Sequence, residues 1–340
     1  MHFPANIRST LLRCLIAGLS VSVSLHSLAR DAVSSGFSVE KTERGATVKA
    51  DGALVAEYVT DQANKPYLWP VIGPTGKPVT RAFPMEDVAG DVKDHPHHRS
   101  IWFGHEDING VDTWTENATW KGGKPQQKDS RLSKLGAIKH REFRELKGDA
   151  EKAVIASVSD FVGPQGEKTL EQEQRITFRK SGDARLIDYD MVFTASEGPV
   201  RFGDMKDAGF NIRVATSMAV DSKQGGKIIN SEGVTDAAAW AKRAKWVDYH
   251  GPVDGETVGI AILDHPSNLR HPTPWHVRTY GLFTANPFGT RSLDPKSPDG
   301  AFTVQKGERL KLRYRVILHK GDEKAGRIAE AFETYAGEKE

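Results

Sequence analysis

Apolar and polar side chains alternate with a period of two along several stretches of this chain. Within 169–180, Leu170, Ile176 and Phe178 fall on one face of an extended strand, and the charged residues fall on the other. The segment 185–193 repeats the pattern, with an apolar or aromatic residue at every second position. Such alternation is typical of antiparallel strands with one buried and one solvated face.

Turn residues and further alternating runs extend this pattern along the chain. Asp51-Gly52 predicts a tight hairpin within 46–59, because this dipeptide tolerates the positive φ angles of such turns. The polar segment 115–129 contains Gly and Pro and predicts an exposed loop. Further strands are expected at 210–220, 257–264, 277–284 and 310–319.

Near the C-terminus the spacing of apolar residues changes to that of a helix. Within 322–335, Ala325, Ile328, Ala329 and Phe332 fall on one side at helical spacing. We therefore expect one short helix after the last strand.

These elements predict an all-β fold for residues 30–340: a single large antiparallel β-sandwich with a short C-terminal helix. No internal repeat, low-complexity tract or linker divides this segment. A chain of 340 residues is also long enough to bury a large core in one such domain.

Residues 1–29 are typical of a signal peptide. Arg8 and Arg13 give a positive start, 11–25 is a short apolar core, and 27–29 ends in small residues that a signal peptidase reads. We expect export to the periplasm or the extracellular space, with no stable membrane insertion after removal of the signal. An uncleaved anchor is the alternative, although the apolar run is shorter than the ~20 residues that span a bilayer.

Composition excludes several classes of function. A formal net charge of +2 gives no basic field for nucleic acid. The single cysteine, Cys14, lies in the predicted signal peptide, so the exported chain has no thiol nucleophile and no thiolate metal site. Serine-hydrolase, nucleotide-binding and H-E-x-x-H motifs are also missing from the sequence.

Histidines gather in two short windows that lie far apart in the sequence. The first window, 94–114, contains His95, His97, His98 and His105; the second, 265–278, contains His265, His271 and His276. Histidine changes its charge near neutral pH and also binds metals. We expect folding to bring the two windows into one functional pocket.

Two kinds of chemistry are open for the first window. His95 and His97 would share one face of an extended backbone, so these two residues and His105 are candidate ligands of a divalent metal, with acidic neighbours supplying oxygen. A looped backbone, which Pro96 favours, would instead present one histidine as a general acid or base without metal. No cofactor is certain from the sequence.

Arginine and tryptophan residues accompany both windows. Arg99 and Arg278 suit the binding of a carboxylate or a polarised oxygen, or they form structural ion pairs with Asp94 or Asp112. The tryptophans suit stacking on a sugar ring or burial in the core. Candidate substrate-binding residues are Trp102, His105, Trp114, His271, Trp275 and Asn286.

Three blocks of sequence resemble the family usually labelled methane oxygenase PmoA, which is found in exported bacterial proteins. The blocks are His95 to Trp102, Asn109 to Trp114, and His271 to Gly289. The resemblance implies a galactose-mutarotase-like β-sandwich and a setting in carbohydrate breakdown. It implies no methane oxidation, because the genuine membrane subunit of that name requires spanning segments, and this chain has none after residue 29.

Together these features predict an exported enzyme that acts on a carbohydrate or a sugar-derived substrate by histidine acid/base catalysis. It would cleave a glycoside or an oxidised or uronic sugar by hydrolysis or elimination. An aldose mutarotase and a non-catalytic sugar-binding protein are the alternatives. The candidate catalytic residues are His97, His98, Arg99, His276 and Arg278.

Overall fold

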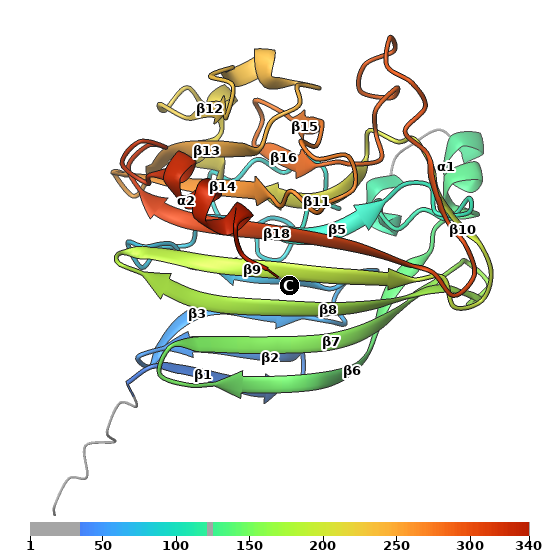
Figure 1. Ribbon diagram of the computed structural model, residues 1–340, viewed down its shortest axis with the longest axis horizontal. Helices are drawn as coiled ribbons and strands as arrows, with labels where there is room; N and C mark the ends of the chain where they lie inside the picture. The colour runs from blue at the N-terminus through green and yellow to red at the C-terminus, as the bar shows by residue number, and fades with distance from the viewer. Residues whose placement is uncertain (1–34, 121–124, 340) are drawn as a thin grey trace, which may run out of the picture. The chain divides into compact units, whose positions relative to one another are not determined.

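The computed structural model describes residues 35–120 and 125–339. Two eight-stranded sheets, in which neighbouring strands are antiparallel, make up most of this part of the chain (Figure 1). The predicted antiparallel β-sandwich is therefore confirmed. The predicted signal peptide, 1–29, lies outside the described residues. In the described part, no helix has both the length and the apolar character that crossing a bilayer requires.

The first sheet carries most of the first histidine window. In spatial order its strands are β1 (Phe37–Thr42), β2 (Gly45–Ala50), β3 (Ala53–Val59), β4 (Tyr67–Val71), β5 (Ile101–His105), β11 (Ala208–Arg213), β16 (Leu282–Ala285) and β15 (Trp275–Val277). The turn between β2 and β3 is the predicted hairpin, and Asp51 and Gly52 both have positive φ angles.

The second sheet contains the longest strands. In spatial order these are β12 (Lys227–Asn230), β13 (Trp246–Val253), β14 (Glu256–Asp264), β18 (Arg309–Lys320), β9 (Ala184–Thr194), β8 (Lys168–Ser181), β7 (Lys152–Val162) and β6 (Ala137–Gly148). A separate two-stranded ribbon pairs β10 (Val200–Phe202) with β17 (Phe302–Val304).

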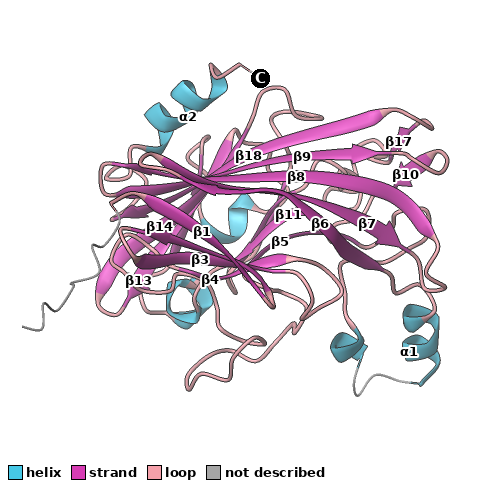
Figure 2. Ribbon diagram, turned by 90° about the horizontal axis from the view of Figure 1, so that it is seen from below, coloured by secondary structure: helices cyan, strands magenta, loops and turns pink. Residues whose placement is uncertain are grey.

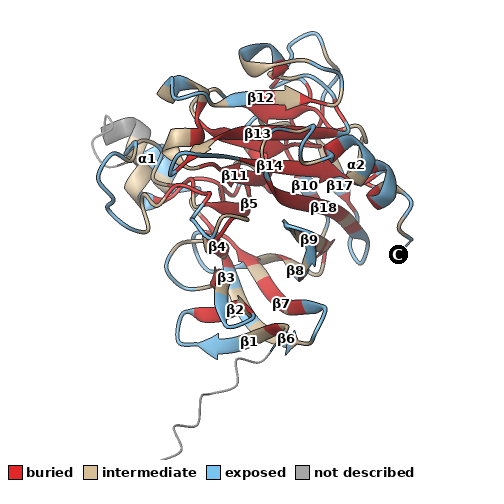
Figure 3. Cartoon of the chain, turned by 90° about the vertical axis from the view of Figure 1, so that its left-hand side faces the viewer, coloured by how far each residue is buried: buried red, intermediate tan, exposed pale blue. Residues whose placement is uncertain are grey.

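The core lies between the inner faces of the two sheets (Figure 3). Phe103 of β5 contacts Phe193 of β9 with ring centroids 4.8 Å apart, and Phe210 of β11 stacks on Tyr314 of β18 at 5.0 Å. Leu170 of β8 is buried in the same core, as the alternation predicts. Burial of one face of each sheet therefore accounts for the period of two in the sequence.

Two of the predicted strands are shorter than expected. The strand expected at 210–220 ends as β11 at Arg213, and short 3-10 turns follow it. The strand expected at 277–284 is instead two strands, β15 and β16, joined by a turn in which Gly281 has a φ of 103°. Apolar side chains continue after β11 at Val214, Met218 and Val220, so the hydrophobic pattern did not reveal that end. The turn between β15 and β16 does contain polar residues, Arg278 and Thr279, which the alternation did not separate from a strand.

The prediction of an exposed loop at 115–129 was wrong in part. Thr115 and Glu116 are buried, a 3-10 turn covers Asn117–Trp120, and helix α1 covers Pro125–Leu132. These polar residues are buried because they have partners: the Asp112 carboxylate accepts hydrogen bonds from two backbone amides and from the Thr115 hydroxyl.

The C-terminal helix α2 spans Ile328–Ala336, so it begins six residues later than 322. A turn held by the Asp322 carboxylate, which accepts a hydrogen bond from Ala325 N at 2.9 Å, precedes the helix. Its buried residues, Ile328, Phe332 and Tyr335, pack on the outer face of the second sheet (Figure 2). Ala325 and Ala329, which we expected on the buried side, are exposed.

We predict that Phe332→Ala lowers the free energy of unfolding by about 3–5 kcal/mol, the usual cost of deleting a buried aromatic ring. Phe332 is 3% exposed and packs with Ile328 and Tyr335 against the sheet. Urea denaturation followed by circular dichroism measures the change. The neighbouring exposed Glu333→Ala should change stability by less than about 0.5 kcal/mol. Equal effects of the two variants would contradict this packing.

Candidate functional site

Alternation along β5 separates the two halves of the first histidine window. Trp102 lies on the outer face of the first sheet, where it packs with Tyr67 and Trp114. His105, three residues on, points into the core and contacts Phe202 and Phe288. Burial lowers the pKa of His105 to about 3, so its ring is neutral. His105 is therefore part of the core and lies apart from the other histidines of its window.

The loop that carries His95, His97 and His98 is held to the sheet by an ion-pair cluster of two buried arginines and the partly buried Asp94. The Asp94 carboxylate binds the guanidinium of Arg81 and, at 2.7 Å, that of Arg213 on β11. His95 begins a turn in which the backbone amide of His98 donates a hydrogen bond to the His95 carbonyl at 3.0 Å. This anchor presents the histidine rings on the outer side of the first sheet.

Residues of both histidine windows line one pocket of about 370 Å³. Its first wall comes from the loop after Asp94, and its second comes from β15 and the turn after it. The lining residues are His95, His97, His98, Glu106, Trp114, Thr115, Thr119, Trp120, Arg131, Lys206, Asp207, His276, Arg278 and Tyr280. Folding thus brings the two windows together, as the sequence predicts.

His265 and His271 lie outside this pocket. His265 is hydrogen-bonded to Ser267 at 2.7 Å and contacts Arg313 on β18. His271 is hydrogen-bonded through Nδ1 to Asp264 at 2.8 Å. Both therefore serve the packing of the loop before β15 against the second sheet.

His98 and His276 have opposite hydrogen-bonding roles. Arg213 Nη1 donates to His98 Nδ1 at 3.1 Å, and a guanidinium can only donate, so neutral His98 carries its proton on Nε2. His276 Nδ1 donates to the backbone carbonyl of Lys206 at 2.7 Å, which leaves Nε2 unprotonated. The pocket therefore has one imidazole whose Nε2 donates a hydrogen bond and one whose Nε2 accepts it. Trp114 contacts both rings, at 5.9 Å and 6.3 Å between centroids.

Burial keeps His97, His98 and His276 neutral. It lowers the pKa of His276 to about 4, and it lowers the pKa of His97 and His98 well below their usual value. The positive charge of Lys65 lowers the pKa of His97 further. At neutral pH these side chains are therefore hydrogen-bonding groups and bases, not cations.

The two candidate arginines have different surroundings. Arg278 is exposed at the pocket, and its guanidinium lies over the rings of Trp240 and Tyr280, 4.8 Å and 5.5 Å from their centroids. It has no carboxylate partner among the residues that the structure describes. Arg99 instead forms a bidentate ion pair with Glu116, with both contacts at 2.7 Å.

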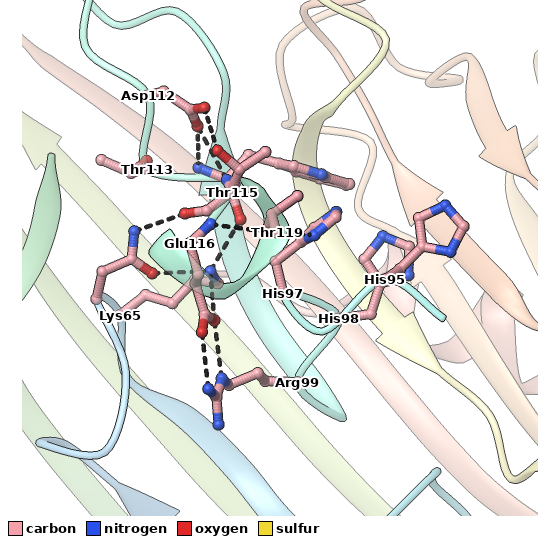
Figure 4. Close-up of polar contacts among 12 residues, drawn as sticks. Lys65, His95, His97, His98, Arg99, Asp112, Thr113, Thr115, Glu116 and Thr119 are labelled. Carbon is pink, nitrogen blue, oxygen red and sulfur yellow. Dashed lines mark hydrogen bonds and ion pairs between the residues drawn. The ribbon is translucent and has the colours of Figure 1, made fainter. Parts of the chain in front are cut away.

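Beneath the pocket, Glu116 holds two cations (Figure 4). Its carboxylate accepts a hydrogen bond from the fully buried Lys65 at 3.1 Å in addition to those from Arg99. Burial opposes its ionisation, but the two cations outweigh burial and lower the pKa of Glu116 to about 2. The sequence suggested Asp94 or Asp112 as the partner of Arg99; the partner is Glu116. Thr119, which is hydrogen-bonded to His97 at 3.0 Å, links this network to the pocket.

Two carboxylates of the pocket, Glu106 and Asp207, lie at the ends of the paired strands β5 and β11. Burial and the charge of Asp207 raise the pKa of Glu106, although its ion pair with Arg131 opposes that shift. Lys206 pairs with Asp207 at 2.6 Å. Sequence reasoning missed Asp207 and Lys206, because ordinary charged residues outside both windows carry no motif.

The remaining candidates have mainly supporting positions. Trp275 is fully buried and donates to Ala244 O at 2.9 Å, and Trp102 is buried beneath the histidine loop. The Asn286 amide donates to the carbonyls of Met205 and Lys206, so it fixes the segment that binds His276. Of the six candidate substrate-binding residues that the sequence suggested, only Trp114 lines the pocket.

The structure does not assemble the metal ligands that the sequence suggested. His95 and His97 lie 5.7 Å apart between ring centroids, but His105 points into the core on the other face of β5. Within the described residues, a group with the spacing of metal ligands is found elsewhere, at Asp248, His250 and Glu323. The polar groups that line the pocket itself are imidazoles, carboxylates and cations.

A family model described as "Family of unknown function (DUF6807)" matches residues 45–333. The chain belongs to this family. The match covers both histidine windows and every strand of the pocket. The methane oxygenase label that the sequence resemblance suggested is not supported by these comparisons. A search of curated proteins finds no match to this DUF6807 protein.

Solved structures with a similar arrangement of strands are only distantly similar to the DUF6807 chain. Slr1438 from Synechocystis sp. PCC 6803 shares 8% identity over 84% of this chain and 96% of its own, with a TM-score of 0.36. A galactose mutarotase-like protein from Lactobacillus casei ATCC 334 shares 9% identity over 84% and 100%, with a TM-score of 0.35. A polysaccharide lyase shares 14% identity over 85% of this chain and 33% of its own, with a TM-score of 0.31.

We predict that Glu116→Gln lowers the free energy of unfolding at pH 7 by about 3 kcal/mol. The folded-state pKa of Glu116 is about 2 against an ordinary value of 4.5, so its stabilisation is present above pH 4.5 and is lost as the pH falls toward 2. The variant should therefore show a weaker loss of stability between pH 4.5 and 2 than the parent. Urea denaturation at several pH values measures both effects.

Glu142→Gln is the matched control, because Glu142 is only partly buried on β6 and pairs with the exposed Arg141 and Arg144. Its free energy of unfolding should stay within about 0.5 kcal/mol of the parent. If Glu116→Gln behaves like this control, the buried network does not stabilise the protein.

Proposed function

We propose that this DUF6807 protein is a carbohydrate-active enzyme in which His276 and His98 perform acid/base chemistry on an acidic sugar. The observation that carries the proposal is the opposite protonation of the two rings in one pocket. His276 offers an unprotonated Nε2, and His98 offers an Nε2 proton. A reaction that removes one proton and delivers another needs this pair of groups.

The surroundings of Arg278 favour a substrate that carries a negative charge. Its guanidinium is held flat over Trp240 and Tyr280 but has no carboxylate partner in the described part of the chain. Guanidinium groups bind carboxylates with two parallel hydrogen bonds. A uronic or otherwise oxidised sugar carries such a carboxylate beside the carbon that would lose its proton.

The reaction that fits these groups best is β-elimination. His276 takes the proton from the carbon next to the carboxylate, while Arg278 stabilises the negative charge that develops on the carboxylate oxygens. The electron pair of the broken C–H bond forms the new carbon–carbon double bond, and the bond to the leaving oxygen breaks. His98 donates a hydrogen bond from Nε2 to that oxygen, and water gives the oxygen its proton. Protonated His276 then returns its proton to the hydroxide that is left, which restores the starting state.

Glycoside hydrolysis is a second candidate, and the raised pKa of Glu106 favours it. A protonated carboxylic acid can protonate a glycosidic oxygen, and a neighbouring carboxylate can activate water. Glu106 and Asp207 line the same pocket and supply these two groups. Under this mechanism Arg278 would contribute only to binding.

Export to the periplasm or extracellular space is part of the proposal. It rests on the signal-peptide pattern of residues 1–29. A substrate outside the cytoplasm would be a free or polymeric sugar.

We predict that His276→Gln lowers the turnover of a uronate-containing oligosaccharide at least ~100-fold, the usual contribution of one acid/base group. The ultraviolet absorbance of the conjugated double bond measures elimination. His140→Gln is the matched control, because His140 lies on β6 outside the pocket, and it should keep the parental rate. An unchanged elimination rate in His276→Gln would refute the role of His276. If the release of reducing ends is lost in Glu106→Gln but not in His276→Gln, the reaction is hydrolysis.

We predict that kcat/KM falls on the acid side with a midpoint near pH 4. The base must be unprotonated, and the pKa of His276 is about 4 because its ring is buried. Activity should therefore persist at pH 5 to 6, where an exposed histidine with a pKa of about 6.5 would already be largely protonated. Initial rates at low substrate concentration across pH 3 to 8 test this. A midpoint near 6.5 would contradict burial of the catalytic base.

A further inference from the structure

A second cluster of titratable side chains lies on the outer face of the second sheet, away from the pocket. Asp248 and His250 are on β13. They lie two and four residues after Trp246, so they share its face of the sheet, and Trp246 packs beneath α2. Glu323 belongs to the turn that precedes α2. None of these residues lines the pocket of the histidine windows. The acid/base chemistry proposed above leaves the cluster unused.

The spacing of the cluster matches a metal-binding site. His250 Nδ1 lies 2.7 Å from Asp248 Oδ1 and 4.0 Å from Glu323 Oε2, and the three atoms all lie within 4.8 Å of one another. Ligand atoms bonded at about 2.0–2.2 Å to a tetrahedral zinc ion are roughly 3.4 Å apart. The observed separations lie on both sides of that value. On binding, the ion would replace the hydrogen bond between His250 Nδ1 and Asp248 Oδ1, and the proton of Nδ1 would move to Nε2 or to water.

A fourth residue holds the central carboxylate in place. His319 Nε2 on β18 is hydrogen-bonded to Asp248 Oδ2 at 2.6 Å, which leaves Oδ1 directed at His250. Metal-binding carboxylates are commonly oriented by such a second hydrogen bond.

Two glycines make room for this orienting histidine. A Cβ atom added at Gly259 or Gly326 would collide with the His319 ring. The ring is thus confined between β14 and the turn before α2. This confinement fixes the direction of the Asp248 carboxylate, which is fully buried.

We propose that Asp248, His250 and Glu323 bind one divalent ion of the zinc type, with water completing the coordination. One imidazole nitrogen and two carboxylate oxygens form a ligand set that zinc accepts. Because Glu323 belongs to the turn before α2 and the other ligands belong to β13, the ion joins the C-terminal segment to the sheet. The site is independent of the reaction proposed for the pocket.

The test is zinc binding by the full exported chain after treatment with a chelator and dialysis. Isothermal titration calorimetry with zinc chloride should give about one ion per chain, and zinc should raise the melting temperature, because a ligand that binds only the folded state stabilises it. Glu323→Gln should weaken zinc binding at least about tenfold and reduce the rise in melting temperature. Asp248→Asn should act in the same direction, with folding checked by circular dichroism.

Matched controls identify the site. Glu330→Gln changes an exposed glutamate of α2 and should bind zinc like the parent. His97→Ala changes the pocket and should also leave zinc binding unchanged. The proposal is overturned if the parent binds no zinc, if Glu323→Gln binds it as tightly as the parent, or if His97→Ala abolishes binding. In the first of these outcomes, His250 and His319 serve as hydrogen-bond partners of Asp248 alone.

Discussion

The pocket depends on one ion-pair cluster, in which the Asp94 carboxylate joins Arg81 and Arg213. Burial disfavours a lone charge, but the hydrogen bond from His95 and the two guanidinium charges outweigh it and lower the pKa of Asp94. Removing one member of such a cluster leaves a buried charge without a partner. Arg213 also donates to His98, so the anchor of the loop determines the protonation of a pocket histidine.

Charge pairing also distinguishes the charged side chains beneath the pocket from Arg278, which lines it. Lys65 and Arg99 share the single carboxylate of Glu116 beneath it. Arg278 is oriented by aromatic rings and keeps its hydrogen-bonding capacity. Under the proposed function, the neutral imidazoles would supply the base, and the guanidinium of Arg278 would attract the anionic substrate.

Part of this arrangement follows from local sequence. Period-two alternation located β8, β9 and β18, and the clustering of histidines located the pocket, since four of the seven clustered histidines line it. Alternation did not reveal the break between β15 and β16, because polar residues such as Arg278 and Thr279 also occur within strands that have one solvated face. Nor did clustering distinguish His105 from its neighbours, since a single step along β5 reverses the face of the sheet.

The sequence by itself determined the antiparallel β-sandwich, the hairpin at Asp51 and the two histidine windows, because burial of one face and turn geometry are local requirements. Tertiary structure alone decided which histidines meet, which arginine stays unpaired and which carboxylates join the pocket. Glu116, Asp207 and Arg213 come from segments that only strand pairing brings together. The pKa of a histidine and the partner of an arginine depend on such neighbours, and no local pattern encodes them.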